Sequence, residues 1–352
     1  MKIAVIACSN GLGHIKRDIK IINAIQASGT VKVDLFCEGW QIEKLNTWED
    51  LLRCKNSENS EIFRQNFPLK WSNQSDYYGE WLLNLHDAMD GWDLDHYDLI
   101  LSDNYVEPLL YSKNVLLCGS FLWHDILATS FPTNDSIQEY YVRTSKLLKD
   151  RNPSMIVNKY FVMKSVLTQV NSCKVGIIHF HTPPTQTRER LGNGSKNILI
   201  ALGNAELTQS HLHQLREFIA TIKNSEYTLH ITDRWREYFL PDCGSTSDYS
   251  FGSSNLHNID IAIIRGGIGT ISDCIAAKIP MIYVHDENPE VKHNQECLRK
   301  MNIGIPLSSI NNPKISPLMN DEQYRNMEKN FSNFDLNGVE EASDIIKSRI
   351  LR

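Results

Sequence analysis

The sequence predicts an α/β protein built from two Rossmann-like, doubly wound domains that face each other across a cleft. The chain has 352 residues, which is long for one hydrophobic core and suits two domains. Apolar runs of strand length alternate with stretches of helical period in both halves, as in parallel sheets covered by helices. Each half also carries a glycine-rich turn directly after a predicted strand, at the edge where ligands of open α/β sheets bind.

The composition narrows the class of protein. Apolar residues make up 41% and charged residues 22%, as in ordinary globular proteins, and the net charge of −6 argues against a nucleic-acid partner held by bulk charge. The eight cysteines are scattered without a CxxC pair, so we expect free thiols in a reducing cytoplasm. The first apolar run is too short for a signal peptide, and no run reaches the roughly 18 residues of a spanning helix.

The first domain is expected over residues 1–182 and opens with a βαβ unit. Its apolar pattern predicts a strand, a helix and a strand, over Lys2 to Cys8, Ile15 to Ala27 and Val31 to Cys37. The turn after the first strand contains Gly11 and Gly13 but lacks the third glycine of a dinucleotide fingerprint. It is therefore a candidate substrate-binding loop rather than a dinucleotide site.

His14 stands at the mouth of this turn, where an imidazole can act as a general base near neutral pH. A histidine that packs or caps at a helix start is the alternative, and the local sequence supports both interpretations equally. Arg17 lies one helical turn further on and is a candidate substrate contact.

Polar residues follow two more predicted strands of this domain. The strand over His96 to Ser102 ends at Asp103 and Tyr105, and the strand over Val115 to Cys118 is followed by His124 and Asp125. Carboxyl ends of parallel strands meet at one edge of a sheet, so these four side chains are site candidates. A helix over Ile137 to Lys149 and a last strand over Val175 to Phe180 complete the predicted domain.

Residues 55–95 are both aromatic and polar. Aromatic side chains bind sugars and lipids but also fill cores, so the segment predicts either core or a flap on the acceptor side, with core favoured. Asp93-Leu94-Asp95 spells the DxD of metal-dependent glycosyltransferases, but it precedes a strand instead of ending one. No metal site is therefore predicted.

A change of composition over residues 183–196, from prolines to charges to glycines, predicts a linker between the domains. The second domain is expected over residues 197–330, and residues 331–352 predict a C-terminal helix that packs back on the first domain. The second domain restarts the strand–helix pattern, and its first strand leads into Gly203 and Asn204. Its strands are predicted over Asn197 to Leu202, Tyr227 to Ile231, Ile259 to Ile264 and Met281 to Val284, its helices over Leu212 to Ile222 and Val291 to Met301, and a loop over Pro241 to Ser254.

The stretch RGGIGTISD, from Arg265 to Asp273, follows a buried apolar run. Its glycines allow a sharp turn and the close approach of a ligand. The helix that follows would present free N–H groups and a positive dipole end, which suit a phosphate or diphosphate, and Asp273 is placed to hold a ribose diol. A tight turn without a ligand is the alternative. The candidate contacts are Arg265, Gly266, Gly267, Ile268, Gly269, Thr270 and Asp273.

Two of these segments together resemble a known family. The turn GLGH, and RGGIGTISDCIAAKIPMIYV followed by HNQECLRKMNIG, are similar to the GT-B glycosyltransferases, above all to the branch of the N-acetylglucosaminyltransferase that forms lipid II. The resemblance implies a nucleoside-diphosphate sugar on the second domain, Asp273 at the ribose, His14 near the reaction centre, and no metal or other cofactor. It places sugar or phosphate contacts from Glu287 onward. The family's glutamine before an Asn-Ala pair is not clear here, and the best register puts His293 and Glu296 at those places.

The run GLGHIKRDI and the later SDNY are also similar to the UDP-sugar hydrolase of pseudaminic acid synthesis, which has the same fold and uses water as acceptor. That resemblance implies that His14 is the base and that Asp103 and Tyr105 match the hydrolase's aspartate-x-tyrosine. The fuller GGIGT motif favours a transferase over a hydrolase.

The sequence thus predicts a glycosyltransferase that moves a sugar from a nucleotide sugar, expected to be a UDP-sugar, to a hydroxyl of a sugar, lipid-linked or protein acceptor. An inverting displacement and a place in cell-surface glycan or glycoconjugate synthesis follow from the resemblance. A nucleotide-sugar hydrolase and a non-catalytic nucleotide-sugar-binding subunit are the alternatives. Peripheral contact with the inner face of the membrane stays open, since such contact needs no spanning helix.

Overall fold

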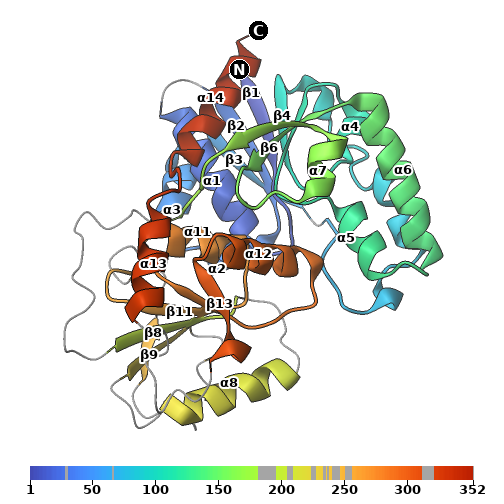
Figure 1. The fold of residues 1–352 in the computed structure, drawn as a ribbon. Coiled ribbons are helices and arrows are strands. Elements are labelled where there is room, and N and C mark those ends of the chain that lie inside the picture. The colour runs from blue at the N-terminus through green and yellow to red at the C-terminus, as the bar shows by residue number, and fades with distance from the viewer. Residues whose placement is uncertain are drawn as a thin grey trace. The chain divides into compact units, whose positions relative to one another are not determined.

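The computed structural model describes residues 1–27, 31–65, 67–180, 196–203, 209–222, 227–232, 235, 238–239, 246–249, 256–310 and 321–351. They form two compact units (Figure 1). The first comprises Met1–Ile178, Asn288–Glu290 and Asn337–Arg352, and the second comprises His179–Glu287 and Val291–Leu336. Most of the predicted linker, residues 183–195, lies outside the described residues, and residue 196 already belongs to a strand.

The first unit is built on a sheet of seven parallel strands in the order β3-β2-β1-β4-β5-β6-β7. The inner strands β1, β4 and β5 are buried along almost their whole length, as expected where helices cover both faces of a sheet. The strands are β1 (Lys2–Ile6), β2 (Lys32–Cys37), β3 (Ser60–Arg64), β4 (Leu99–Asp103), β5 (Val115–Cys118), β6 (Ser154–Asn158) and β7 (Asn171–Val175).

Two groups of helices pack on this sheet. α1 packs against α3 and α14, while α6 packs against α4, α5 and α7 (Figure 1). The apolar residues of α1 at Ile15, Ile19 and Ile22 are fully buried, which explains the helical period of that stretch. The helices are α1 (Leu12–Gln26), α2 (Gly39–Lys44), α3 (Glu49–Asn56), α4 (Pro108–Tyr111), α5 (Trp123–Ser130), α6 (Asp135–Arg151), α7 (Lys164–Gln169) and α14 (Gly338–Ile350).

The last helix, α14, belongs to the first unit and lies beside α1 and β7 (Figure 1). Its start approaches the chain after β7 very closely, since a Cβ at Gly338 would lie 2.6 Å from the backbone oxygen of Gly176. Glu341 accepts a hydrogen bond from the Gly176 N–H at 2.6 Å. The C-terminal segment is thus fixed to the first sheet by backbone contact as well as by apolar packing.

The aromatic segment packs mainly as core of the first unit. Phe67, Tyr78 and Tyr97 are at most 4% exposed, and Trp71 and Trp81 pack against the same cluster with part of their surface in solvent. Short 3-10 turns carry the segment: η1 (Ser75–Tyr77), η2 (Glu80–Leu82), η3 (Leu85–Asp87) and η4 (Leu94–His96). The core interpretation is therefore the one that the burial supports.

The second unit is built on a sheet of six parallel strands in the order β10-β9-β8-β11-β12-β13. The strand β11 lies between β8 and β12 and is fully buried, as its run of isoleucines predicts. The elements are β8 (Lys196–Ala201), α8 (Gln209–Ile222), β9 (Tyr227–Thr232), β10 (Thr246–Tyr249), β11 (Ile261–Ile264), α11 (Ile268–Ala276), β12 (Met281–Tyr283), α12 (Pro289–Lys300), β13 (Gly304–Pro306), η6 (Leu307–Ser309) and α13 (Asp321–Phe331).

Some predicted elements are wrong or missing. The predicted strand over Val175 to Phe180 is wrong: β7 ends at Val175, because the Gly176 N–H bonds to Glu341 instead of continuing the strand pairing. The strands β3 and β10 were not predicted because they are polar edge strands without an apolar run, and β10 falls inside the predicted loop. The strand β6 was missed because only three apolar residues mark it.

Candidate functional site

The glycine turn of the first unit opens onto an uncapped helix. Gly11 has φ 141°, a conformation that side chains rarely adopt, and it directly precedes α1, whose N-terminus receives no side-chain cap. A Cβ at Gly11 would meet no atom within 4 Å. Gln41 donates hydrogen bonds to the carbonyls of Cys8 and Gly11, both at 2.9 Å. The turn is thus held from one side and open on the other, while Gly13 is already part of the helix.

His14 and Asp103 form a buried pair beside this turn. Nδ1 of His14 lies 3.0 Å from Oδ1 of Asp103, and the two side chains are 8% and 0% exposed. The pair forms because β1 and β4 are neighbours in parallel, so the helix after β1 meets the last residue of β4. A carboxylate that accepts from Nδ1–H leaves Nε2 as the imidazole's acceptor nitrogen, which is the arrangement a general base requires.

Arg17 completes the cluster. Its Nη2 donates to the same Asp103 oxygen at 2.6 Å and lies 3.2 Å from His14 Nδ1. Burial by itself raises the pKa of Asp103, but the guanidinium of Arg17 and then the imidazole of His14 outweigh it and hold the pKa below its ordinary value. Asp103 is therefore a stable carboxylate that orients the histidine. The structure brings His14, Arg17 and Asp103 together, as their predicted positions at strand and helix ends suggest.

Tyr105 braces the glycine turn of the first unit. Its side chain is fully buried, and its hydroxyl accepts from the Ser9 N–H at 2.9 Å and hydrogen-bonds to the Ser9 hydroxyl at 2.8 Å. Burial raises the pKa of Tyr105 well above its ordinary value, so this phenol does not exchange protons near neutral pH. Tyr105 thus fixes the glycine turn through Ser9, and its predicted catalytic role stays a prediction.

Asn104 was missed by the sequence reading. It has φ 57°, and its Nδ2 lies 3.4 Å from Nδ1 of His14. Gly119, directly after β5, leaves room for this side chain, since a Cβ there would lie 1.7 Å from Asn104 Oδ1. An asparagine after one strand and a glycine after the next are visible in the sequence, but only the order of strands shows that they meet.

His124 and Asp125 form a separate cluster at the start of α5. Nε2 of His124 lies 2.8 Å from Oε1 of Gln169 on α7, whose Nε2 donates to Asp125 at 2.8 Å. His124 is fully buried, and burial lowers its pKa, so the imidazole stays neutral. In the structure these two residues join α5 to α7, with His124 fully buried and Asp125 11% exposed, and their predicted substrate contact stays a prediction.

The glycine turn of the second unit follows β11. Gly266 has φ 121°, and Gly267 precedes α11, whose N-terminus also receives no side-chain cap. The first N–H groups of a helix have no intrahelical acceptor, and here they belong to Ile268, Gly269 and Thr270, which are partly exposed. A Cβ at Gly267 would meet no atom within 4 Å. This helix start has the geometry of an anion site.

Side chains of α12 hold the second turn from behind. Asn294 donates to the Gly266 carbonyl at 3.1 Å, and Gln295 donates to the carbonyls of Arg265 at 2.6 Å and Val284 at 2.7 Å. Arg265 itself pairs with Asp286 through Nε. The sequence register placed His293 and Glu296 at the important positions, whereas the two residues between them face the turn. A short sequence match does not show which side of a helix a residue lies on. The burial of Asn294 and Gln295 shows that these two residues lie on the packed side of α12.

The remaining predicted site residues of the second unit each have different contacts. Oδ1 of Asp273, which is 3% exposed, accepts from the Phe180 N–H at 2.7 Å. Glu287 is 76% exposed and bonds to His285 at 2.7 Å, and His293 lies 3.6 Å from the Cys297 sulfur. Gly203 has φ 72° and accepts from Trp235, while Asn204 lies outside the described residues.

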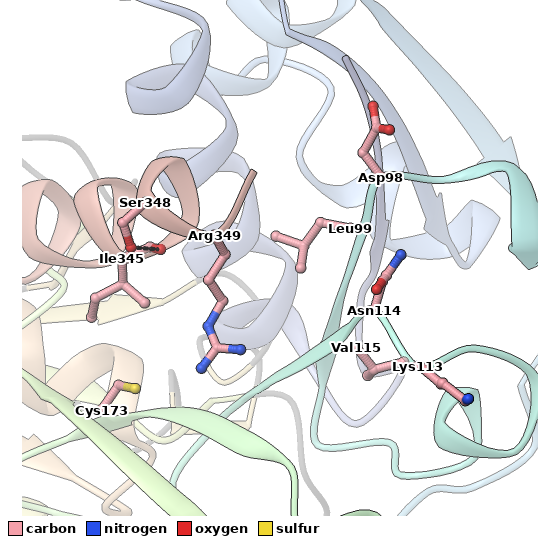
Figure 2. A pocket seen from close by; sticks show the side chains of 9 residues that line it. All are labelled: Asp98, Leu99, Lys113, Asn114, Val115, Cys173, Ile345, Ser348 and Arg349. Atoms are coloured by element: carbon pink, nitrogen blue, oxygen red, sulfur yellow. Dashed lines mark hydrogen bonds between the residues drawn. The ribbon is translucent and has the colours of Figure 1, made fainter. Parts of the chain in front are cut away.

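A surface hollow of about 410 Å³ lies elsewhere on the first unit (Figure 2). It is lined by the amino ends of β4 and β5 and by Ile345, Ser348 and Arg349 of α14, as the sticks in Figure 2 show. Parallel strands place these amino ends at the edge of the sheet opposite to Asp103. The hollow contains none of the predicted site residues.

Within the described part of the chain, no group of three or more His, Cys, Asp or Glu side chains is placed to hold a metal ion. No helix among those residues is both long and apolar enough to cross a bilayer.

No protein-family model matches the chain, and no curated protein matches it in sequence. Solved structures match over nearly the whole chain. The glycosyltransferase of kitacinnamycin is 14% identical with a TM-score of 0.65, and the calicheamicin glycosyltransferase CalG4 is 13% identical with a TM-score of 0.65, each comparison covering 99% of this chain and 98% of the other. The structure of LpCGTa in complex with UDP is 10% identical with a TM-score of 0.65, over 100% of this chain and 99% of the other. At such identities the likeness shows the fold, and it confirms the predicted class: two Rossmann-like α/β domains of the GT-B type.

Proposed function

We propose that the protein is a glycosyltransferase that moves a sugar from a nucleoside-diphosphate sugar to a hydroxyl acceptor. The observation that carries the proposal is the buried His14–Asp103 pair, 3.0 Å apart, beside an open helix start at the ligand-binding edge of the first sheet. The glycosyltransferases of kitacinnamycin and calicheamicin, which share the fold, support the same reaction class.

The first unit supplies the proton acceptor. Asp103 accepts from Nδ1–H of His14, so Nε2 takes the proton of the incoming hydroxyl as that oxygen attacks the anomeric carbon. The Asp103 carboxylate then stabilises the imidazolium that forms. Arg17 keeps Asp103 ionised and fixes the oxygen to which the histidine donates. The proton thus goes from the acceptor hydroxyl to His14, and the nucleoside diphosphate leaves with the bonding electrons of the broken C–O bond.

The second unit supplies the donor site. The N–H groups at the start of α11, from Ile268 to Thr270, are suited to the diphosphate and stabilise the charge that develops as it leaves. The UDP bound in the LpCGTa structure supports a nucleoside diphosphate as the ligand class. Asp273 at the ribose, and Glu287 and His293 near the sugar, remain proposed contacts that rest on the family resemblance.

The finer parts of the proposal concern the acceptor and the metal. The resemblance of the glycine motif to the lipid II branch supports an acceptor in a cell-surface glycan or glycoconjugate and transfer without a metal. The structures with the same fold include the glycosyltransferases of kitacinnamycin and calicheamicin, so small-molecule acceptors belong in the same test panel.

The test is a panel of UDP- and dTDP-sugars with the purified full chain, first without and then with acceptors. We expect binding of one donor, little release of nucleoside diphosphate alone, and rapid release once the right acceptor is added. Stoichiometric release of free sugar without an acceptor would show a hydrolase instead. Binding without release under any acceptor would show a non-catalytic subunit, and binding of no donor would remove the donor site from the Gly266 turn.

A further inference from the structure

The helix α1 carries a second buried carboxyl beside the His14 cluster, and the mechanism above does not use it. Asp18 follows His14 by one helical turn, adjoins Arg17 and is 0% exposed. Within the described part of the chain, neither Asp18 oxygen has a geometrically acceptable hydrogen-bond donor, and the same holds for Oδ2 of Asp103. Nε of Arg17 is buried without an acceptor as well. Three buried carboxyl oxygens of this cluster thus lack a donor among the described protein groups.

The charges of the cluster do not balance if both carboxyls are ionised. Asp18 and Asp103 would then carry two negative charges against the single guanidinium charge of Arg17, since the proposed mechanism starts from His14 as an unprotonated base. A buried charge without a partner is costly, and a carboxyl in that position takes up a proton instead. One proton restores neutrality and turns one of the donorless oxygens into a donor.

Asp18 is the member that holds this proton. Asp103 already accepts from both His14 and Arg17 through Oδ1, which keeps it ionised, whereas Asp18 has no such donors. The free Oδ2 of Asp103 is the acceptor that a protonated Asp18 can serve. We propose that Asp18 is held as the neutral acid in the folded protein and hydrogen-bonds to Asp103, which makes it a positioning residue for the His14–Asp103 pair.

The surroundings of Asp18 agree with a neutral acid. Burial and then the charge of Asp103 raise the pKa of Asp18 well above its ordinary value, against the opposing charge of Arg17. Cys37 on β2 and Cys118 on β5 are the titratable groups that sense Asp18 from the sheet. Burial raises the pKa of both thiols, that of Cys37 to about 12, so neither adds a charge near neutral pH.

The inference deepens the proposed function, on which its catalytic part rests, but its protonation can be tested without turnover. Asp18→Asn keeps the shape, removes the charge and offers an amide N–H to Asp103. Because the pKa of Asp18 is raised in the folded protein, wild-type stability falls as pH rises from about 4 toward that pKa. The D18N protein has no carboxyl at this position and does not show this loss. We expect the D18N protein to be at least as stable as wild type at pH 7, with its advantage vanishing below about pH 4.

Asp34→Asn is the matched control. Asp34 is a buried carboxylate of the same sheet that accepts from the Tyr97 hydroxyl at 2.6 Å and pairs with Lys2 at 2.7 Å. Its amide variant should lower the melting temperature at pH 7, because an amide cannot pair with the ammonium group. A D18N protein that loses stability at pH 7 as the D34N protein does would overturn the proposal, since Asp18 would then be an ionised partner of Arg17.

Infrared spectroscopy of the full chain gives the second readout. At pH 7, the wild-type spectrum should contain one carbonyl band of a protonated carboxyl that the D18N spectrum lacks. This band should shift on transfer to D₂O. The subtraction also removes the band of Glu107, whose pKa burial raises to about 7. If the D18N spectrum instead lacks a carboxylate band that wild type shows, the proposal is overturned.

The positioning role has its own test. Asp18→Leu should lower kcat about tenfold with donor affinity unchanged, since Asp103 loses a donor, and D18N should recover most of that loss. Equal turnover of the two variants would remove the positioning role. If Asp18 is protonated but His14→Ala retains full activity, the proposed function fails while the protonation stands.

Discussion

The two glycine turns of the molecule share a backbone and differ in what surrounds it. Each follows a parallel strand, uses a glycine with positive φ and leads into a helix without a side-chain cap. The first turn is backed by titratable side chains: His14, Arg17, Asp18 and Asp103. The second turn is backed by amides of Asn294 and Gln295 that hold its carbonyls. One backbone motif therefore suits proton transfer in one unit and anion binding in the other.

The largest effect should come from the buried charges behind the first turn. Asp103→Asn leaves the Arg17 charge buried without its partner, and we expect the free energy of unfolding to fall by about 3–5 kcal/mol. Asp286→Asn, at the Arg265 pair of the second turn, is the comparison and should cost less, because both side chains are more exposed. Chemical denaturation of the two variants measures both. An equal or larger loss in D286N would contradict the contrast between the turns.

The pH dependence of the same variant follows from the lowered pKa of Asp103. A carboxyl whose folded pKa is depressed contributes stability above its unfolded pKa of about 3.9, and that contribution is lost as pH falls through the folded value. Between pH 5 and pH 2, the D103N protein should therefore lose less stability than wild type on acidification. Parallel acid-denaturation curves for the two proteins would show that Asp103 is not held ionised.

Next in size is the conformation of the second turn. Gly266→Ala places a Cβ 3.2 Å from Val291 and Gln295 at φ 121°, so we expect a loss of about 1–3 kcal/mol in stability and about a tenfold loss in donor affinity. Gly267→Ala is the matched control, since its Cβ has open space and its φ is −66°. Thermal melts and calorimetry with UDP would measure both properties. A G266A protein that binds UDP as wild type does would exclude the turn as the anion site.

The amides behind that turn should matter less individually. Gln295→Ala removes the donor to two carbonyls and should cost about 1–3 kcal/mol of stability. Glu296→Ala is the neighbouring control, with a side chain that is 51% exposed, and should change little. The ratio of UDP affinities of the two variants shows whether the hydrogen bonds of Gln295 also set the geometry of the binding site. A larger loss in E296A would restore the register that the sequence suggested.

The smallest effect is expected at Asp273. Asp273→Asn keeps an oxygen for the Phe180 N–H but removes the charged acceptor for a ribose diol, so UDP affinity should fall about three- to tenfold with little change in melting temperature. Calorimetry with UDP and with inorganic diphosphate separates ribose contact from phosphate contact. Unchanged UDP affinity would remove Asp273 from the ribose site.

The sequence predicts the apolar inner strands and the two glycine turns, because apolar runs and glycines are local signals. It cannot show which side chains are buried. Tyr105 and His124 were predicted at the site from their positions after strands, and the structure shows both fully buried with hydrogen bonds to Ser9 and Gln169. Asp18 was missed for the opposite reason: a signal was present, since it shares the buried face of α1 with Ile15 and Ile22, where a carboxyl needs an explanation.

The sequence also does not show which distant segments of the chain lie next to each other. His14 and Asp103 were each placed at the end of an element, but their pairing depends on β1 lying next to β4, with Ile6 opposite Ser102. The missed residue Asn104 depends on the same order of strands. For α12, the short sequence match pointed to His293 and Glu296, and only the structure shows that Asn294 and Gln295 between them hold the carbonyls of the Gly266 turn.

The central claim is the division of labour between the two turns, and one measurement tests it most directly: kcat and donor affinity of His14→Ala in the full chain, beside the surface control His213→Ala. We predict that kcat falls by roughly 10²- to 10⁴-fold in the H14A protein while calorimetry gives an unchanged Kd for the donor. The H213A protein should match wild type in both, because His213 is 72% exposed on α8. Wild-type turnover in the H14A protein, or loss of donor affinity in step with turnover, would contradict the account.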